Sequence, residues 1–388
     1  MSLPPVEPDT KDWTWVLARP CPECGFVAAD VSANGLADAI RENAASWATA
    51  LGGPEVASRP EPGVWSPLEY ACHVRDVHRI FEERVRLMLE QDTPRFANWD
   101  QDETAVAGRY AEQEPEAVAA QLAAAAGAVA DRYAGVPDGA WGRRGNRSDG
   151  SEFTVESLGR YHLHDVVHHV HDVGRVAKAA TVAAYDASAE AYRDGTVTMP
   201  AAVGDLVSRF VARVPAGSRV LEIGSGPGRD AATLESLGLS VRRTDVATGF
   251  VALLTAAGHR ADVLDPLTDD LADPGRGGAA YDGVWASACL LHVARADLPV
   301  VLRRLAGATR SGGTLHVSLK EGDGEAWSTH GNVAAPRLFV YWREQPLREV
   351  LEEAGWSVDE VTRNDGLRGD NWLEVLATHE VLATRKDA

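Results

Sequence analysis

The sequence predicts two domains, an all-α four-helix bundle followed by a doubly wound α/β domain. The first observation is a length of 388 residues, for which two domains are the usual expectation. The second is a set of four long amphipathic helical patterns in the first half. The third is an apolar stretch that runs into a glycine-rich turn at residues 219–228, as the first strand of a doubly wound sheet does. We expect an N-terminal segment over residues 1–24, the bundle over residues 25–176 and the α/β domain over residues 182–385.

The composition restricts the classes of partner. The chain carries a formal net charge of −19, whereas nucleic-acid-binding domains need a basic face. No apolar run reaches the ~20 residues of a transmembrane helix, and the first residues lack the basic start and apolar core of a secretory signal. The four cysteines fit a reducing compartment. We expect a cytoplasmic protein with neither a nucleic-acid nor a membrane partner, and the sequence leaves its oligomeric state open.

The predicted bundle rests on apolar residues at helical spacing. In the first helical pattern, Leu36 and Ile40 begin one apolar stripe. The second pattern opens with Ser66 as the N-cap and Glu69 three positions later, which is a capping box. Between the second and third patterns lies a polar stretch that we expect to be loop with partial structure. The four helices are expected at about residues 31–51, 66–90, 115–135 and 154–178, and the polar stretch at about 91–114.

A cluster of histidines on the fourth helix indicates a metal site. His164 and His168 stand four positions apart and share one helix face, which is the spacing of helical histidine pairs that chelate a metal. His73 lies on the apolar stripe of the second helix, and a bundle can bring such inward residues together. We predict a divalent metal bound by His73, His164 and His168, with the open coordination positions of a catalytic site. Imidazole suits zinc, nickel and iron alike, so the identity of the metal stays open.

Other residues of this region receive a different interpretation. His171 lies on a similar face and could replace either partner on its helix, whereas His162 and His169 point elsewhere and are not expected as ligands. Cys21 and Cys24 form a Cys-x-x-Cys pair, but the chain has no second such pair to complete a zinc knuckle. We interpret the cysteine pair as a turn near the start of the domain.

The first half resembles the DinB family over about residues 25–176. The resemblance is carried by the segment from Trp65 to His73 and by His164 with His168. It implies a four-helix bundle whose metal is held by one histidine of the second helix and a His-x-x-x-His pair of the last. Relatives in that family include thiol-dependent transferases and isomerases.

The glycine-rich turn of the second half indicates a cofactor site. Gly224, Gly226 and Gly228 remove every Cβ from the turn, so the backbone can approach a ligand closely. A dinucleotide fingerprint would need Gly-x-Gly-x-x-Gly or Ala, but its third small position is occupied by Arg229. The next strand ends in Asp245, where an acid can accept hydrogen bonds from ribose hydroxyls.

Ordered motifs over about residues 180–385 resemble class I S-adenosylmethionine-dependent methyltransferases. Beyond the glycine turn and Asp245, these motifs are residues 261–265, 281–288 and 312–318. The resemblance implies that the glycine turn holds the methionine end of S-adenosylmethionine, that the acid after the second strand binds the ribose, and that an acid after the third meets the adenine. The cofactor-binding residues that it implies are Glu222, Gly224, Ser225, Gly226, Gly228, Asp245, Val246, Asp262, Val263 and Ala286.

We predict a methyltransferase that acts on a small molecule. Methyl transfer from a sulfonium is an in-line displacement in which the enzyme mainly positions the acceptor. A nitrogen or thiol acceptor must also lose a proton, and His292, just after the fourth strand, is the candidate base. By resemblance to small-molecule methyltransferases, residues 185–192 are expected to cover the cofactor and residues 337–342 to close over the acceptor.

Two alternative functions remain open at this point. In one, the bundle is the main enzyme, a metal- and thiol-dependent transferase or isomerase to which methylation is linked. In the other, the bundle is a non-catalytic module that binds a partner or presents substrate. Thiol-dependent turnover by the bundle would favour the former, and absence of metal the latter.

Overall fold

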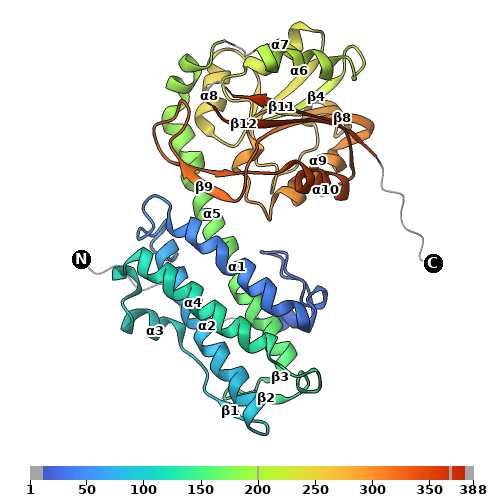
Figure 1. The fold of residues 1–388 in the computed structure, drawn as a ribbon. Coiled ribbons are helices and arrows are strands. Elements are labelled where there is room, and N and C mark those ends of the chain that lie inside the picture. The colour runs from blue at the N-terminus through green and yellow to red at the C-terminus, as the bar shows by residue number, and fades with distance from the viewer. Residues whose placement is uncertain (1–11, 199–200, 367–368, 381–388) are drawn as a thin grey trace, which may run out of the picture. The chain divides into compact units, whose positions relative to one another are not determined.

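The computed structural model describes residues 12–198, 201–366 and 369–380, and the chain divides into two compact units, Met1–Ala177 and Lys178–Ala388 (Figure 1). Each unit is built around buried apolar clusters of its own. The first unit is helical and the second is α/β, which confirms the predicted order of fold classes.

The N-terminal unit is a helical bundle. Its core collects apolar side chains from all four long helices, including Leu36, Trp47, Val77, Leu122 and Val166, each at most 1% exposed. The four helices are α1 (Leu36–Leu51), α2 (Pro67–Glu90), α4 (Pro115–Ala134) and the first part of α5 (Val155–Gly195).

Short elements precede and connect these helices. The polar stretch after α2 contains a short strand and a short helix, as expected of partial structure, whereas the strands before α5 were not predicted. The strands form a small sheet in the order β1-β2-β3. The short elements are η1 (Trp13–Leu17), η2 (Ala28–Asp30), η3 (Ala33–Gly35), β1 (Arg95–Phe96), α3 (Gln101–Ala107), η4 (Tyr110–Glu112), η5 (Asp138–Ala140), β2 (Arg144–Arg147) and β3 (Glu152–Thr154).

The start of α2 confirms the predicted capping box. The Glu69 backbone N–H donates to the Ser66 hydroxyl at 3.2 Å, and the Ser66 N–H donates to the Glu69 carboxylate at 2.9 Å. These bonds satisfy backbone donors that the first helical turn leaves without partners. Arg59 also pairs with the Glu69 carboxylate, with its Nε 2.8 Å from Oε2.

Helix α5 is longer than the sequence predicted. It continues without a break over both the helix expected to end near residue 178 and residues 185–192, the segment expected to cover the cofactor. The continuity has a local reason, because no proline interrupts the segment and alanine, the best helix former, is frequent there. Gly159 permits close packing in this helix, since a Cβ at that position would lie 2.5 Å from Leu36 Cδ1.

The C-terminal unit contains a seven-stranded sheet in the order β11-β12-β8-β7-β4-β5-β6. The strands from β8 to β6 pair in parallel, and β12 pairs antiparallel with both β8 and β11. This order confirms the predicted doubly wound fold. The strands are β4 (Arg219–Ile223), β5 (Ser240–Asp245), β6 (Ala261–Val263), β7 (Tyr281–Ala286), β8 (Thr309–Lys320), β11 (Trp356–Asp365) and β12 (Asn371–His379).

Helices cover both faces of this sheet (Figure 1). On β4, Val220 packs with Phe210 and Leu234, whereas its neighbour Leu221 packs with Leu302 on the other face, because successive side chains of a strand point to opposite faces. A separate hairpin, β9 (Glu325–Ser328) with β10 (Arg337–Val340), follows β8. The helices are α6 (Ala201–Val211), α7 (Arg229–Ser236), α8 (Thr248–Ala256), η6 (Pro274–Arg276), η7 (Leu290–His292), α9 (Leu298–Ala308) and α10 (Glu344–Glu353).

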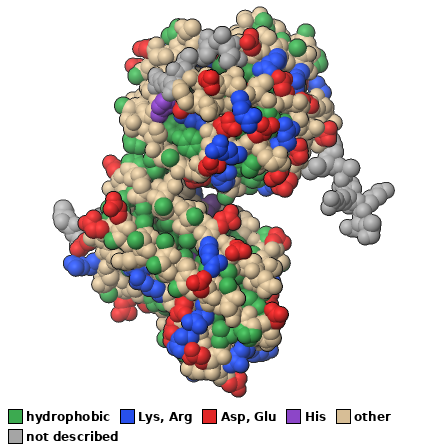
Figure 2. All heavy atoms as spheres, viewed as in Figure 1, with side chains coloured by type: hydrophobic (Ala, Val, Ile, Leu, Met, Phe, Trp, Pro, Cys, Tyr) green, Lys and Arg blue, Asp and Glu red, His purple; other side chains and the backbone are tan. Residues whose placement is uncertain are grey.

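The surface is mixed in charge. On the face shown in Figure 2, lysine and arginine side chains are interspersed with aspartate and glutamate. Within the described ranges, each helix is too short or too polar to cross a membrane.

Candidate functional sites

The glycine turn after β4 combines two tightly packed positions with one open position. All three glycines have positive φ, the conformation that a side chain disfavours. A Cβ at Gly224 would lie 2.3 Å from Cys289 Cβ, and one at Gly228 would lie 2.5 Å from Leu254 Cδ2. A Cβ at Gly226 would meet no atom within 4 Å. Gly224 and Gly228 therefore fit the turn against its neighbours, while Gly226 leaves space above the backbone for a ligand.

Glu222 and Ser225 hold this turn to the next strand. The Ser225 N–H donates to the Thr244 carbonyl at 2.9 Å, and the Thr244 N–H returns a bond to the Ser225 hydroxyl at 3.0 Å. The Ser225 hydroxyl also contacts the Glu222 carboxylate, which is only 2% exposed. Burial raises the pKa of Glu222 to about 8. Glu222 is thus an internal support of the turn in this structure.

Asp245 lies beside the open glycine and is almost fully buried. Its Oδ2 accepts the Gly226 N–H and its Oδ1 accepts the Ala247 N–H, both at 2.8 Å. Each carboxylate oxygen has a further lone pair that can accept a hydroxyl hydrogen. Burial raises the pKa of this carboxyl to about 6.

The end of β6 lies next to Asp245. Val263 pairs in register with Asp245 and is 53% exposed, an unusual exposure for an apolar side chain at a strand end. Asp262 points one oxygen at Arg242, whose Nε donates to Oδ2 at 2.9 Å, which leaves Oδ1 for another donor. Ala286 is fully buried at the end of β7 and Val246 is half-buried after Asp245. The predicted cofactor residues therefore gather at one edge of the sheet, except that Ala286 is not accessible there.

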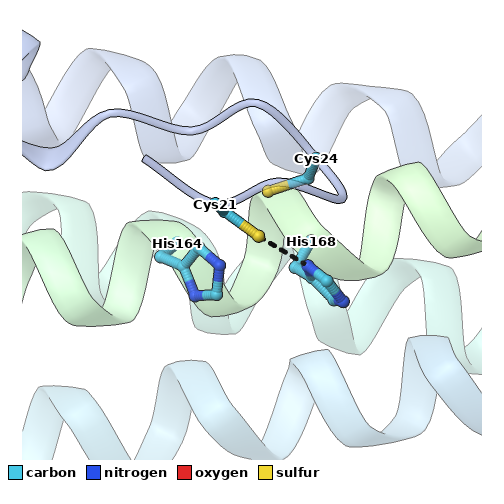
Figure 3. A group of neighbouring side chains, drawn as sticks. All are labelled: Cys21, Cys24, His164 and His168. Carbon is cyan, nitrogen blue, oxygen red and sulfur yellow. Dashed lines mark hydrogen bonds between the residues drawn. The ribbon is translucent and has the colours of Figure 1, made fainter. Parts of the chain in front are cut away.

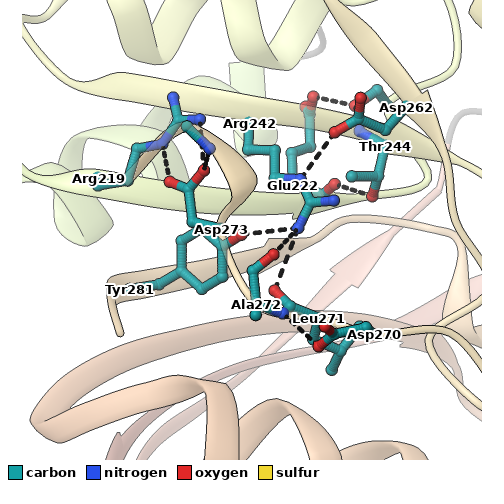
Figure 4. Close-up of polar contacts among 12 residues, drawn as sticks. Arg219, Glu222, Arg242, Thr244, Asp262, Asp270, Leu271, Ala272, Asp273 and Tyr281 are labelled. Carbon is teal, nitrogen blue, oxygen red and sulfur yellow. Dashed lines mark hydrogen bonds and ion pairs between the residues drawn. The ribbon is translucent and has the colours of Figure 1, made fainter. Parts of the chain in front are cut away.

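Arg242 was not singled out from the sequence, and it organises the loop after β6 (Figure 4). Its Nη1 donates to the carbonyls of Leu271 and Ala272 at 3.1 and 3.0 Å, and to the Tyr281 hydroxyl at 2.8 Å. An arginine within a buried strand is the signal in the sequence, because a buried charge needs partners. Through these bonds, Arg242 fixes the loop and the orientation of Asp262.

A hydrogen-bonded chain surrounds the predicted base. His292 Nδ1 lies 2.6 Å from the Leu338 carbonyl, and because a carbonyl only accepts, Nδ1 carries the proton. His292 Nε2 then accepts from the Tyr185 hydroxyl at 2.8 Å, and the Tyr185 oxygen accepts from Arg337 Nη1 at 3.1 Å. Burial lowers the pKa of His292 to about 4 and raises that of Tyr185 to about 12. Both groups are neutral at pH 7.

Tyr185 belongs to the part of α5 that was expected to cover the cofactor. Its ring contacts Tyr192 and Phe250, with centroids 5.8 and 6.0 Å away. Asp186 accepts the Gly249 N–H at 2.6 Å, which ties this part of α5 to the start of α8. The sequence predicted a role for this segment but did not identify Arg337 as the partner of Tyr185.

The structure does not bring the predicted metal set of His73, His164 and His168 together. The reason is the rotation of α5, because positions 165 and 169 lie about 100° round the helix from positions 164 and 168. His73 faces the former pair. In each resulting group, the candidate ligand atoms lie within 4.8 Å of one another. The two groups are His73 with Asp165 and His169, and Cys21 with Cys24, His164 and His168 (Figure 3).

The group around His73 is partly buried, because His73 is fully buried while Asp165 and His169 are half-buried. His73 Nε2 lies 3.6 Å from Asp165 Oδ1, and His169 Nε2 lies 3.7 Å from the same oxygen. Both ring nitrogens of His73 and Asp165 Oδ1 are buried without a hydrogen-bond partner. Trp99 stacks on His73 with centroids 5.1 Å apart. Buried polar atoms of this kind call for a ligand, and two nitrogens with one oxygen form a donor set that transition metals accept.

Two other histidines of α5, His162 and His171, lie outside both groups. The structure explains the position of His162. His162 is fully buried in the core, where its Nε2 lies 3.0 Å from His78 Nδ1 and its Nδ1 lies 3.4 Å from the Tyr133 hydroxyl. His171 is half-buried and, within the described residues, belongs to neither group.

Comparison with known proteins identifies both halves. Residues 36–173 match the family model described as the DinB superfamily, and residues 197–361 match one described as a methyltransferase domain. These matches confirm the predicted combination of domains. The search among curated proteins found no match to this chain.

Several solved structures similar to the chain are methyltransferases, and one is the [4+2]-cyclase SpnF. A 1,6-didemethyltoxoflavin-N1-methyltransferase from Burkholderia thailandensis is 23% identical, with 54% of this chain and 91% of that chain covered and a TM-score of 0.44. Phosphoethanolamine N-methyltransferase 2 from Haemonchus contortus is 16% identical, with 50% and 57% covered and a TM-score of 0.40. Magnesium protoporphyrin IX methyltransferase from Synechocystis PCC 6803 is 17% identical, with 46% and 79% covered and a TM-score of 0.36.

Proposed function

We propose that this chain, which joins a DinB-superfamily domain to a methyltransferase domain, uses S-adenosylmethionine to methylate a small molecule while its bundle holds a divalent metal ion. The observation that carries the methylation proposal is the open position at Gly226. There the backbone has positive φ, no atom lies within 4 Å of a Cβ built on it, and its N–H is held by Asp245. The net charge of −19 supports a small acceptor over a nucleic acid.

We propose that the edge formed by β4, β5 and β6 binds the cofactor. When bound, S-adenosylmethionine supplies an electrophilic methyl group that passes from its sulfur to a lone pair of the acceptor. Gly226 lets the backbone approach the methionine end, and the free lone pairs of Asp245 accept the ribose hydroxyls. The exposed Val263 offers an apolar surface to the adenine, and Asp262 Oδ1 accepts from its amino group.

We propose that His292 acts on the acceptor through Tyr185. The neutral imidazole accepts the Tyr185 O–H at Nε2, and Arg337 donates to one lone pair of the phenol oxygen. One lone pair of that oxygen is left to accept an N–H or O–H of the acceptor. This arrangement orients the acceptor, which is the main contribution that an enzyme makes to a methyl transfer.

We propose that His73, Asp165 and His169 hold the metal of the bundle. His169 supports this assignment because its Nδ1 lies 3.1 Å from Asp172 Oδ2, and metal-binding histidines usually donate their second ring N–H to a carboxylate. Three protein ligands leave positions for water or substrate, and a metal there would act as a Lewis acid or lower the pKa of a bound water or thiol.

The acceptor class can be tested by following an isotope label. The intact protein would be incubated with methyl-labelled S-adenosylmethionine and a cell extract, and the products separated by size. We expect the label in small molecules other than S-adenosylmethionine that pass a small-pore filter, and only when the protein is present. Label that appears in nucleic acid or in protein would refute the small-molecule proposal.

A second function is favoured by the group of His73, Asp165 and His169 in the bundle. Trp65 and Tyr70 lie close to it, with Trp65 5.1 Å from His73 and Tyr70 5.2 Å from His169 between ring centroids. Aromatic walls around this donor set suit a metal site that binds a substrate, and the DinB resemblance implies a thiol-dependent transferase or isomerase. Enzymatic turnover that requires a low-molecular-weight thiol, and that His169→Ala loses while Gly226→Val keeps it, would support this function. Absence of metal from the purified protein would instead favour a bundle that only binds a partner.

A further inference from the structure

The second group of candidate ligands lies between an N-terminal loop and α5. Cys21 and Cys24 precede residues 36–173, the part of the chain that matches the DinB superfamily. His164 and His168 lie on α5. The group therefore joins a segment outside the family match to the last helix of the bundle, across 147 positions in the case of Cys21 and His168.

The loop is shaped so that both cysteines face α5. The Gly25 N–H donates to the Cys21 carbonyl and the Cys21 N–H donates to the Phe26 carbonyl, both at 2.9 Å, which closes a tight turn. Gly25 has a φ of +74°, which glycine adopts without strain. Figure 3 shows the two cysteines on this turn opposite His164 and His168.

The distances suit a single tetrahedral ion. Zn–S and Zn–N bond lengths require ligand atoms about 3.3–3.8 Å apart in a tetrahedral site. Cys21 Sγ already lies 3.7 Å from His168 Nδ1, and all four ligand atoms lie within 4.8 Å of one another. Closing the remaining gaps needs rotamer shifts of the order of 1 Å.

The surroundings of His164 and His168 favour ligands of a metal ion over side chains that only fill the core. His164 is 3% exposed, and its Nε2 is buried without a hydrogen-bond partner. His168 Nε2 faces Glu23 Oε2 at 3.5 Å while its Nδ1 faces Cys21, which is the orientation of a metal-bound imidazole with a carboxylate behind it. The ring of Trp13 covers both histidines, with centroids 5.5 and 5.0 Å away.

We infer that Cys21, Cys24, His164 and His168 form a structural zinc site that fastens the N-terminal segment to α5. Two thiolates and two imidazoles are soft and borderline ligands that select zinc over magnesium or calcium. Four protein ligands fill the tetrahedron, so the site has no position for substrate. Binding releases the two thiol protons, and the ion fixes the rotation of α5 and hence the direction of Asp165 and His169 on its adjacent face.

The inference is tested on the intact protein by elemental analysis and by cobalt substitution. We expect about one zinc per chain that Cys24→Ser loses, while Cys72→Ser, which removes a buried thiol outside the group, retains it. His73→Ala should also retain this zinc, because His73 belongs to the other group. The cobalt-loaded wild type should show thiolate-to-cobalt charge-transfer absorption, a readout that needs no variant.

Two outcomes would overturn the inference. One is a cobalt-loaded wild type without thiolate absorption, which would show that the cysteines do not ligate even if Cys24→Ser fails to fold. The other is protein produced under reducing, zinc-supplemented conditions that contains a Cys21–Cys24 disulfide or the same zinc content as Cys24→Ser. Neither outcome depends on methyl transfer, so the zinc site and the proposed function can fail separately.

Discussion

Replacing Asp245 by asparagine should weaken S-adenosylmethionine binding without unfolding the domain. Asp245 accepts two backbone N–H bonds of 2.8 Å and, in our proposal, the ribose hydroxyls as well. An amide keeps one acceptor oxygen but turns an NH₂ group toward a backbone donor or a hydroxyl. A hydrogen bond to a charged group contributes about 1.5–3 kcal/mol, which corresponds to an affinity loss of about 10- to 150-fold.

The pH dependence of binding gives this prediction a second readout. Burial raises the pKa of Asp245 from 3.8 to about 6, so its contribution to the free energy of unfolding is fully present below pH 3.8 and is lost as pH rises through about 6. The pH dependence of cofactor affinity has the opposite sign, because the ribose hydroxyls bond to the ionised carboxylate, which is lost as the pH falls. We expect wild-type affinity to fall by up to about tenfold per pH unit below pH 6, and Asp245→Asn to lack this step.

Calorimetry over this pH range, with Asp282→Asn as the control, would measure both effects. Asp282 also accepts a backbone N–H, from Arg219 at 2.9 Å, but it lies in β7 away from the glycine turn. Its replacement should leave cofactor affinity unchanged. An Asp245→Asn variant that binds as tightly as wild type, with the same pH dependence, would refute the assignment of the ribose site.

Three further predictions concern other parts of the chain. Tyr185→Phe should lower kcat by about 5- to 150-fold, the value of one or two buried hydrogen bonds of about 1–3 kcal/mol, with an unchanged cofactor Kd in calorimetry; an unchanged kcat would exclude Tyr185 from the acceptor site. His73→Ala should lose the metal of the open bundle site in elemental analysis while His171→Ala keeps it, and equal metal content in both variants would contradict the ligand assignment. Gly159→Val should lower the free energy of unfolding of the bundle in urea by about 1–3 kcal/mol, since its Cβ would lie 2.5 Å from Leu36 Cδ1; full stability would mean that the helices can separate at no cost.

Features set by neighbouring residues could be predicted from the sequence. The capping box at Ser66 and Glu69 depends on positions three apart, and it forms as expected. The glycine turn and Asp245 follow from one strand–turn–helix unit and the strand after it. The capping box and the glycine turn depend on residues a few positions apart, so the local sequence determines their geometry.

Features set by packing between distant segments could not be predicted. The helical spacing places His164 and His168 on one face of α5, but the direction of that face depends on how the whole helix rotates in the bundle. That rotation turns Asp165 and His169 toward His73 and leaves the other pair for Cys21 and Cys24. Arg242 is a similar case, since its partners lie in a loop about 30 residues later in the chain.

The most direct test of the central claim is S-adenosylmethionine binding to wild type, Gly226→Val and Gly217→Val by isothermal titration calorimetry. Gly217 also has positive φ and no atom within 4 Å of an added Cβ, so its replacement carries a similar backbone strain outside the proposed site. We expect wild type and Gly217→Val to bind one equivalent of cofactor and Gly226→Val to bind none. Equal affinity in Gly226→Val and wild type would mean that the cofactor does not lie on this turn.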